Sequence, residues 1–198
     1  MSQAAEPVPG LQYAYKPSLM GGVWTFELAP DALVWTIGSA SGRVRYTDIR
    51  RIRMAFRPVT LQSHRFLMEI WSDKNPKIPI ASASWKSMME QERLDDPYAR
   101  FVTALHEKIA MAGGTPRLLA GAIPWLYWPG VVIFAGICLA VAALIARALQ
   151  QGETAATFFL LGFFVLLLWQ LGGFFKRNRP RVYTIDALPA DILPKQRS

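Results

Sequence analysis

Two apolar runs decide the fold of this chain: VVIFAGICLAVAALI at Val131–Ile145 and AATFFLLGFFVLLLWQLGGFF at Ala155–Phe175. Neither run contains an acidic or basic residue. An α-helix rises about 1.5 Å per residue, so about 20 apolar residues cross a hydrocarbon core of about 30 Å. A surface helix of a soluble domain has a polar stripe facing water, and neither run has one. The sequence therefore predicts a transmembrane helical hairpin with spans at 124–146 and 154–175 and a turn at 147–153.

The distribution of basic residues indicates how the hairpin is oriented. Residues 1–122 hold 15 basic and 11 acidic side chains, and residues 176–198 hold six basic and two acidic ones. The predicted turn holds one of each sign, Arg147 and Glu153. Because cytoplasmic loops carry an excess of Lys and Arg, we expect both termini in the cytoplasm and the turn outside. With an Ala- and Arg-rich composition, the expected location is a bacterial inner membrane that the chain crosses twice.

Aromatic and basic side chains at the ends of the spans support the same orientation. Trp and Tyr prefer the headgroup level of a bilayer, because their rings are partly apolar and partly hydrogen-bonding. They gather at the start of the first span and near the end of the second, which lie on one side of a hairpin. The predicted interface anchors are Trp125, Tyr127, Trp128, Trp169, Lys176 and Arg177.

Residues 19–114 predict one α+β domain after a flexible leader at 1–18. Short segments rich in Val, Ile, Trp, Phe and Thr alternate with turn residues, which is typical of antiparallel strands. From Pro97 the period becomes that of an amphipathic helix, which Gly113-Gly114 ends. A linker at 115–123 then leads into the hairpin, and an extended tail at 176–198 follows it. The expected strands are Val23–Leu28, Leu33–Ile37, Arg43–Phe56, Arg65–Trp71 and Ile78–Ser82.

The first strands carry a resemblance to a known family. The text VWTFELAPDALVWTIGSASGRVRYTDIRRIRM at 23–54, followed by the remaining strands and one helix, resembles the bacterial PH-like domains of small membrane proteins. The resemblance covers residues 19–112 and is a pattern of hydrophobicity and turns. It implies a partly open, strongly bent antiparallel sheet capped by a C-terminal helix and used for binding. The chain departs from many relatives because its domain precedes the hairpin.

Seven arginines are the candidate ligand-binding residues: Arg43, Arg45, Arg50, Arg51, Arg53, Arg57 and Arg65. Arg51, Arg53 and Arg57 share one parity along a strand and apolar residues occupy the other, so we expect this basic row to point away from the core. Beside an anionic leaflet, each Arg that reaches the surface contributes roughly 1 kcal/mol. The alternative is a solvated polar face that Asp48 and Glu69 partly neutralise. The sequence leaves both interpretations open.

The tail contains an approximate repeat, Asp-Ala-Leu-Pro at 186–189 and Asp-Ile-Leu-Pro at 191–194. A proline every five residues excludes a regular helix and favours an extended conformation. Extended peptides with spaced Leu or Ile side chains dock on sheet edges or in apolar grooves. The alternative is that the tail packs on its own domain or stays mobile. The candidate partner-docking residues are Leu188, Pro189, Ile192, Leu193 and Pro194.

No sequence motif points to catalysis, to a metal or to nucleic acid. His64 and His106 are the only histidines, and no Cys, Glu or His spacing around them matches a metal site. There is no Gly-rich phosphate loop and no nucleophile elbow. We therefore expect no enzyme activity, no cofactor and no metal. The net charge of +8 suggests nucleic acid, but four of these charges lie in the tail beside the hairpin, where membrane topology explains them.

The expected function is a non-catalytic binding or assembly module. A PH-like domain anchored by the hairpin would dock a membrane-protein partner, anionic lipid headgroups or both. The alternative is a small oligomeric transporter, or a subunit of a membrane complex, that acts through the hairpin. Conducting paths usually carry polar residues within the membrane, whereas the spans offer Thr154, Thr157 and Gln170, all toward their ends. The small residues Gly136 and Ala140 would allow close helix packing in a homo-oligomer.

Overall fold

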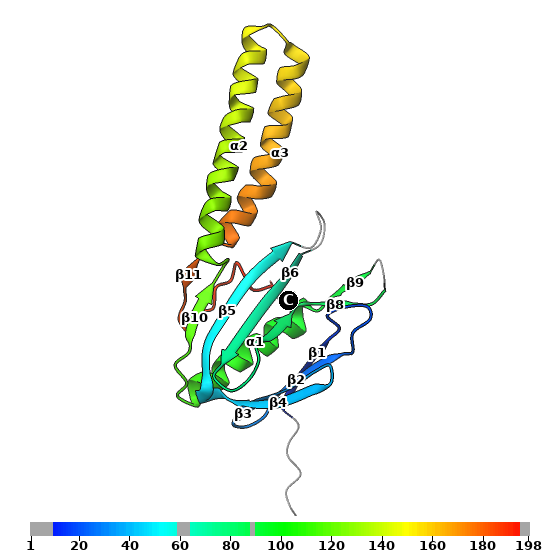
Figure 1. Cartoon of the computed structure of the whole chain (residues 1–198), viewed down its shortest axis with the longest axis vertical. Helices are drawn as coiled ribbons and strands as arrows, with labels where there is room; N and C mark the ends of the chain where they lie inside the picture. The colour runs from blue at the N-terminus through cyan, green and yellow to red at the C-terminus, as the bar shows by residue number, and fades with distance from the viewer. Residues whose placement is uncertain (1–9, 59–63, 88–89, 195–198) are drawn as a thin grey trace, which may run out of the picture. The chain divides into compact units, whose positions relative to one another are not determined.

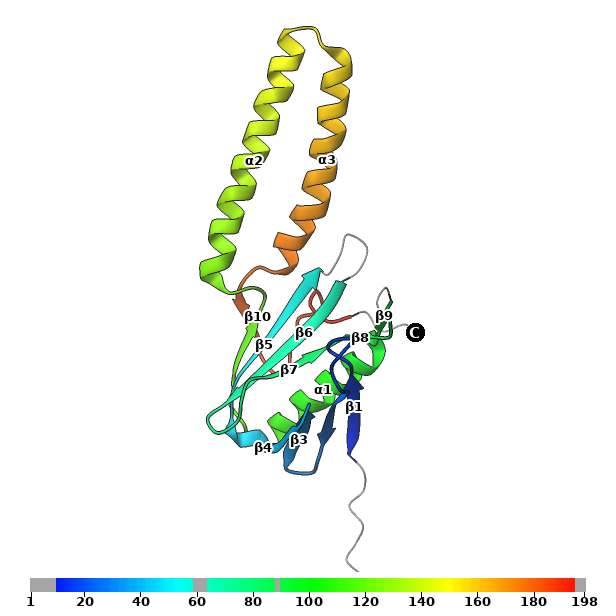
Figure 2. The same cartoon turned by 45° about the vertical axis from the view of Figure 1, so that its right-hand side comes forward.

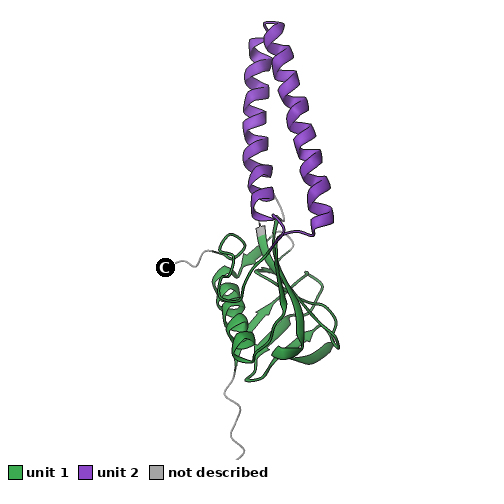
Figure 3. Ribbon diagram, turned by 90° about the vertical axis from the view of Figure 1, so that its left-hand side faces the viewer, with its two compact units in different colours: residues 1–120, 182–198 green, residues 121–181 purple. Residues whose placement is uncertain are grey.

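The computed structural model describes residues 10–58, 64–87 and 90–194, and its elements are labelled in Figure 1. The chain separates into two compact units, coloured in Figure 3. Unit 1 comprises residues 1–120 and 182–198, and unit 2 comprises residues 121–181. Antiparallel sheets, a helix and then two long apolar helices follow in order, which agrees with the predicted sheet domain and hairpin.

A four-stranded antiparallel sheet begins unit 1, in the order β1-β2-β3-β4. Its strands are β1 (Leu11–Tyr15), β2 (Trp24–Leu28), β3 (Ala32–Ile37) and β4 (Ala40–Arg45). Side chains alternate between core and solvent, so Tyr13, Phe26 and Trp35 meet in register on the buried face. Trp35 lies opposite Gly42, where a Cβ would come within 2.5 Å of the indole. Glycine at this position therefore leaves room for the buried Trp35 ring.

Order begins earlier than expected, because β1 lies in the stretch assigned to a flexible leader. Tyr13 and Tyr15 are both buried, and their hydroxyls donate hydrogen bonds to the carbonyls of Ala81 (2.6 Å) and Pro79 (2.9 Å). These bonds join β1 to the edge of a strand nearly 70 residues away in the sequence. The rest of the predicted leader, residues 1–9, lies outside the described residues.

A five-stranded sheet follows, in the order β11-β10-β5-β6-β7. Figure 2 shows β5, β6 and β7 side by side. A separate two-stranded sheet pairs β8 with β9. The bounds are β5 (Ile49–Pro58), β6 (His64–Ser72), β7 (Ile78–Ala81), β8 (Ala83–Trp85), β9 (Gln91–Arg93), β10 (Arg117–Ala120) and β11 (Arg181–Val182).

Two features of this region differ from expectation. The single strand predicted over Arg43–Phe56 is wrong, because a 3-10 turn, η1 (Tyr46–Asp48), separates β4 from β5. The buried Tyr46 donates a hydrogen bond to the Ala29 carbonyl (2.7 Å) at this turn. The segment predicted as a linker, 115–123, contains β10, which pairs parallel with β5. Leu118 and Ala120 of this strand are buried, so core packing explains why it joins the sheet.

The predicted amphipathic helix is confirmed as α1 (Asp95–Met111). The apolar face of α1 is completely buried. The centroid of the Phe101 ring lies 5.4 Å from that of the Tyr13 ring and 6.5 Å from that of the Phe26 ring. Gly113 follows with a φ of 70°, the left-handed conformation that glycine adopts readily after a helix. The fully buried side chains of α1 are Tyr98, Phe101, Val102, Leu105 and Ile109.

The chain returns to unit 1 after the hairpin, and residues 182–194 are here named the returning segment. The Tyr183 N–H donates to the Leu118 carbonyl (3.2 Å), and the Tyr183 ring is buried. Ile192 is 0% exposed and belongs to the core, while Leu188 and Leu193 are half-buried against it. The returning segment therefore packs on its own domain, and unit 1 is built from sequence on both sides of the hairpin.

Unit 2 consists of α2 (Pro124–Gln150) and α3 (Thr154–Arg177), an antiparallel pair drawn in Figure 2. Both helices are long and apolar enough to cross a membrane. In the most apolar 18-residue window of each helix, the buried share is 6% for α2 and 0% for α3. Within this unit the Ala122 N–H donates to the Asn178 carbonyl (2.9 Å). Gly121 has a φ of 86° and lies against the backbone of Arg179. A Cβ at Gly121 would be 2.5 Å from the carbonyl oxygen of Arg179. Glycine thus permits the backbone contact that joins the ends of the hairpin.

Candidate functional site

The seven candidate arginines fall into two groups that the sequence does not distinguish. Arg43, Arg45 and Arg50 form the first group, and each has its own carboxylate partner. Arg45 Nε lies 3.0 Å from Asp48 Oδ2, and Arg50 Nε lies 2.7 Å from Asp73 Oδ2. The third pair joins Arg43 to Asp31. These arginines are exposed but already neutralised by neighbouring acids.

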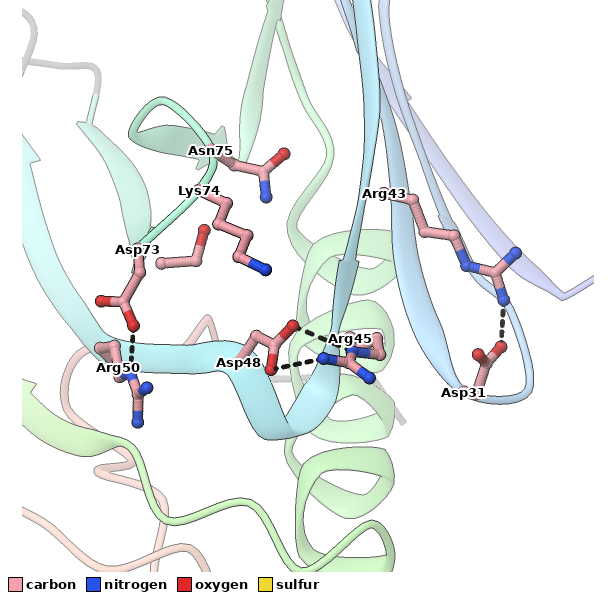
Figure 4. A pocket seen from close by; sticks show the side chains of 9 residues that line it. Asp31, Arg43, Arg45, Asp48, Arg50, Asp73, Lys74 and Asn75 are labelled. Carbon is pink, nitrogen blue, oxygen red and sulfur yellow. Dashed lines mark hydrogen bonds and ion pairs between the residues drawn. The ribbon is translucent and has the colours of Figure 1, made fainter.

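The paired arginines border an open hollow of about 660 Å³, shown in Figure 4. Four cations and three carboxylates line it, so its charge is nearly balanced. The hydrogen bond that Arg50 donates to Asp73 is the main cause that raises the pKa of Arg50. Exposed pairs of this kind contribute little to stability but occupy the guanidinium donors that a ligand would need. The lining residues are Asp31, Arg43, Arg45, Asp48, Arg50, Ser72, Asp73, Lys74 and Asn75.

The second group lies on the face of the five-stranded sheet that points away from the core. Ile52 and Met54 of β5 are fully buried, and the alternating residues Arg51, Arg53 and Arg57 point to the opposite side. This arrangement confirms the predicted parity of the basic row. Arg65 on β6 lies directly across from Arg57 and adds a fourth cation to the same face.

A tryptophan that was not singled out from the sequence organises one end of this face. The guanidinium carbon of Arg51 lies 4.2 Å from the centroid of the Trp71 ring, and that of Arg53 lies 5.4 Å from it. Lys77 Nζ lies 6.0 Å from the same ring and 2.8 Å from Glu69 Oε1. Burial lowers the pKa of Arg53, and the charge of Glu69 partly opposes this shift. Cation–π contacts therefore hold these side chains in place.

Six cations lie together on this side of the sheet, and we call them the basic face. Five are on strands β5, β6 and β10, and the sixth, Lys77, directly precedes β7. Arg117 of β10 belongs to it because it pairs in register with Arg51. Glu69 is the one acidic residue that the described strands β5, β6, β7 and β10 place on this side. Trp71, Lys77 and Arg117 were missed because their positions depend on pairing between strands that the sequence alone did not place in register. The basic face is Arg51, Arg53, Arg57, Arg65, Lys77 and Arg117.

Arg57, Arg65 and Arg117 differ from the other cations of the basic face. Among the described residues, none of the three has a carboxylate or an aromatic ring as partner. The Nε of Arg65 is buried and makes no hydrogen bond. Like charges directly opposite each other on paired strands are destabilising. Within the described part of the chain, the two adjacent positive charges of Arg57 and Arg65 thus have no counter-charge.

The predicted interface anchors lie on unit 2 as follows. Trp125 and Trp128 are exposed at the start of α2, and Trp169 is exposed on α3. Tyr127 donates a hydrogen bond to the Phe175 carbonyl (3.2 Å), which brings the start of α2 beside the end of α3. Lys176 and Arg177 occupy the last turn of α3. The aromatic and basic anchors therefore gather at one end of the hairpin, with Trp169 farther along α3.

The partner-docking residues proposed for the tail lie in the returning segment. Ile192 is used by the core of unit 1, and Leu188 and Leu193 pack partly against that core. Pro194 is buried, and Pro189 is half-buried. The side chains with the largest apolar surface are therefore engaged within their own chain.

The described residues contain no group of three or more His, Cys, Asp or Glu side chains that could hold a metal ion. His64 lies in β6, but its side chain is outside the description. His106 is buried in unit 1 and has two partners. Its Nδ1–H donates to the Val102 carbonyl (2.7 Å), and its Nε2 accepts from the Tyr183 hydroxyl (2.9 Å). This ring joins α1 to the returning segment and has no exposed nitrogen for chemistry.

Acidification is expected to destabilise unit 1 through His106. Burial lowers the pKa of His106 below its usual value, more than the Val102 bond raises it. The unfolded chain therefore binds a proton more readily, and stability falls as the pH drops below about 6.5, by up to about 1.4 kcal/mol per pH unit. Pulse proteolysis of unit 1 in urea at pH 7.5, 6.5 and 5.5 measures this loss.

The matched variant for this measurement is His106→Gln, which is polar but does not titrate. Its stability should be lower at pH 7.5, and the difference from wild type should shrink as the pH falls to 5.5. Every other ionisable group is common to the two proteins, so its contribution cancels in the comparison. A constant difference across this range would contradict the assignment to His106.

No family model matches the chain, and neither a curated protein nor a solved structure matches it.

Proposed function

We propose that this protein is a membrane-anchored, non-catalytic binding or assembly module. The hairpin of α2 and α3 spans a bacterial inner membrane, and unit 1 is a PH-like domain on the cytoplasmic side. The support for the anchor is the length of both helices and the exposure of their apolar side chains. Helices of this composition that are exposed all round need an apolar surrounding, which lipid supplies.

The strongest support for the topology is that unit 1 contains sequence from both sides of the hairpin. Tyr183 and Ile192 follow the hairpin, yet both are buried with side chains that precede it. A domain cannot be assembled across a bilayer, so both ends of a membrane-inserted hairpin lie on the side of unit 1. The basic residues that flank the spans favour the cytoplasm as that side.

The PH-like interpretation rests on the order of the elements in unit 1. A four-stranded antiparallel meander is followed by the antiparallel strands β5, β6 and β7 and then by α1. The buried face of α1 contacts aromatic side chains of the first sheet, as a capping helix would. Fold similarity alone assigns no ligand, so the binding surface is argued from charge and geometry.

The single observation that favours binding is the basic face, with six cations and one carboxylate. A solvated face that served only solubility would carry mixed charges, as the hollow beside β4 does. The basic face instead carries a large excess of positive charge. Its partners are acidic surfaces, either of another membrane protein or of anionic lipid headgroups.

A cysteine placed in the hairpin turn tests the proposed topology. In a Cys138→Ala background, Gln151→Cys puts a thiol at the exposed turn after α2. We expect a membrane-impermeant maleimide to label it from the periplasmic side of intact spheroplasts, because the turn lies outside. A matched Glu92→Cys variant in unit 1 should be labelled only after the membrane is opened. Labelling of the Gln151→Cys thiol from the cytoplasmic side alone would contradict the topology.

A further inference from the structure

Resting on the proposed function, we propose that Arg57 and Arg65 form a contact site for the phosphate groups of anionic lipids. The site is the end of the basic face formed by the last residues of β5 and the first residues of β6. The ligand class is a phosphate monoanion at a bilayer surface, as in phosphatidylglycerol.

The first argument is the direction of the strands in unit 1. β10 runs parallel to β5, and its last residue, Ala120, pairs with Met54. The chain leaves unit 1 at this point, beside Met54 of β5. β5 continues past Met54, and at about 3.3 Å per residue Arg57 lies about 10 Å farther in the same direction.

The second argument is the length of the covalent connection. Three residues separate Ala120 from Pro124, the first residue of α2, so the connection spans at most about 14 Å. A helix that enters the bilayer at its start therefore keeps Ala120 within that distance of the headgroup layer. This short tether therefore holds the strand ends that carry Arg57 and Arg65 near the bilayer surface.

The third argument is the unbalanced charge of this arginine pair. Arg57 and Arg65 face each other across two paired strands and have no described ion-pair partner. An anion between two guanidinium groups removes the repulsion, and arginine binds phosphate oxygens through two parallel hydrogen bonds. The Nε of Arg65 is buried and makes no hydrogen bond, so this donor has no acceptor among the described residues.

Arg117 is also unpaired among the described residues, but it lies beside Arg51 at the opposite end of the basic face, and the remaining candidate cations are already engaged. Arg51 and Arg53 lie over the Trp71 ring, and Lys77 is bonded to Glu69. Arg43 and Arg45 are paired with Asp31 and Asp48 near the other end of β5. The structure thus provides a control pair of the same residue type and the same charge, with partners of its own.

The experiment uses the full chain reconstituted in bilayers of phosphatidylcholine. Electron paramagnetic resonance with spin-labelled phosphatidylglycerol and spin-labelled phosphatidylcholine gives the preference of the protein for the anionic lipid. In the Arg57→Ser/Arg65→Ser variant, we expect the preference for the anionic lipid to fall about five-fold for each arginine removed. The decrease should be smaller in high salt. The Arg43→Ser/Arg45→Ser control removes the same charge and should change the preference less than two-fold.

Removal of two opposed like charges should not unfold unit 1, and pulse proteolysis of both variants checks this. The single variants Arg57→Ser and Arg65→Ser give a graded series if the double variant is less stable. An unchanged preference in the Arg57→Ser/Arg65→Ser variant overturns the proposal, as does an equal loss in the control. Either result leaves the cysteine-labelling test of topology unaffected, so the failure of this site is distinct from the failure of the anchor.

Discussion

Replacing Ile192 by alanine is expected to lower the free energy of unfolding of unit 1 by about 2–5 kcal/mol. Ile192 is 0% exposed and lies in the hydrophobic core with side chains from before the hairpin. The substitution removes buried methyl groups and leaves a cavity, because the surrounding side chains relax only partly. Pulse proteolysis of the full chain in urea, in detergent micelles, measures the change.

The neighbouring residue provides the control. Leu193 has a similar apolar side chain but is only half-buried, so Leu193→Ala should cost less than half as much. If Ile192→Ala had no larger effect than Leu193→Ala, the returning segment would not be part of the core in solution. In that case the returning segment would no longer support the placement of both ends of the hairpin on the side of unit 1.

Arginine at the centre of α3 is expected to prevent stable insertion of the hairpin. Val165 lies midway along α3 and is exposed, so Val165→Arg would place a charge in the hydrocarbon core. The insertion cost at such a position is about 3 kcal/mol. We expect a large part of the Val165→Arg chain to be extracted by alkaline carbonate, whereas the wild-type chain stays in the membrane.

Ala155→Arg is the matched control, because Ala155 lies in the first turn of α3. An arginine there can extend its long side chain to the headgroup layer, so insertion should be nearly unchanged. Equal retention of the Val165→Arg and wild-type chains in the membrane would contradict the assignment of α3 as a span.

Much of the fold could be predicted because its signals are local. The absence of charge marked α2 and α3 within a few residues of their bounds, and alternation marked β2, β3, β6 and β7. β10 was missed because it pairs in parallel with β5, which lies far away in the sequence, and β1 was missed because its segment was assigned to a flexible leader. The break at Tyr46–Asp48 was missed, although Asp48 stands where the alternation of Val44 and Tyr46 requires an apolar residue.

The candidate site was predictable only in part, for a related reason. Strand parity alone places Arg51, Arg53 and Arg57 on one face. The pairing of Arg50 with Asp73 depends on a turn between β6 and β7, more than 20 residues away. Which arginines are neutralised is therefore a property of the assembled sheets. No local sequence pattern separates the paired arginines from the unpaired ones.

The returning segment also sets the order in which the protein can be made. The ribosome synthesises β1 to β10 first, then both apolar helices, and only afterwards Tyr183 and Ile192. In the proposed topology, unit 1 therefore has an incomplete core during translation until the hairpin has been inserted and the chain has returned to its starting side. A nascent chain whose helices failed to insert would keep that core open and exposed to proteases. The proposed topology thus makes the folding of unit 1 depend on insertion of the hairpin.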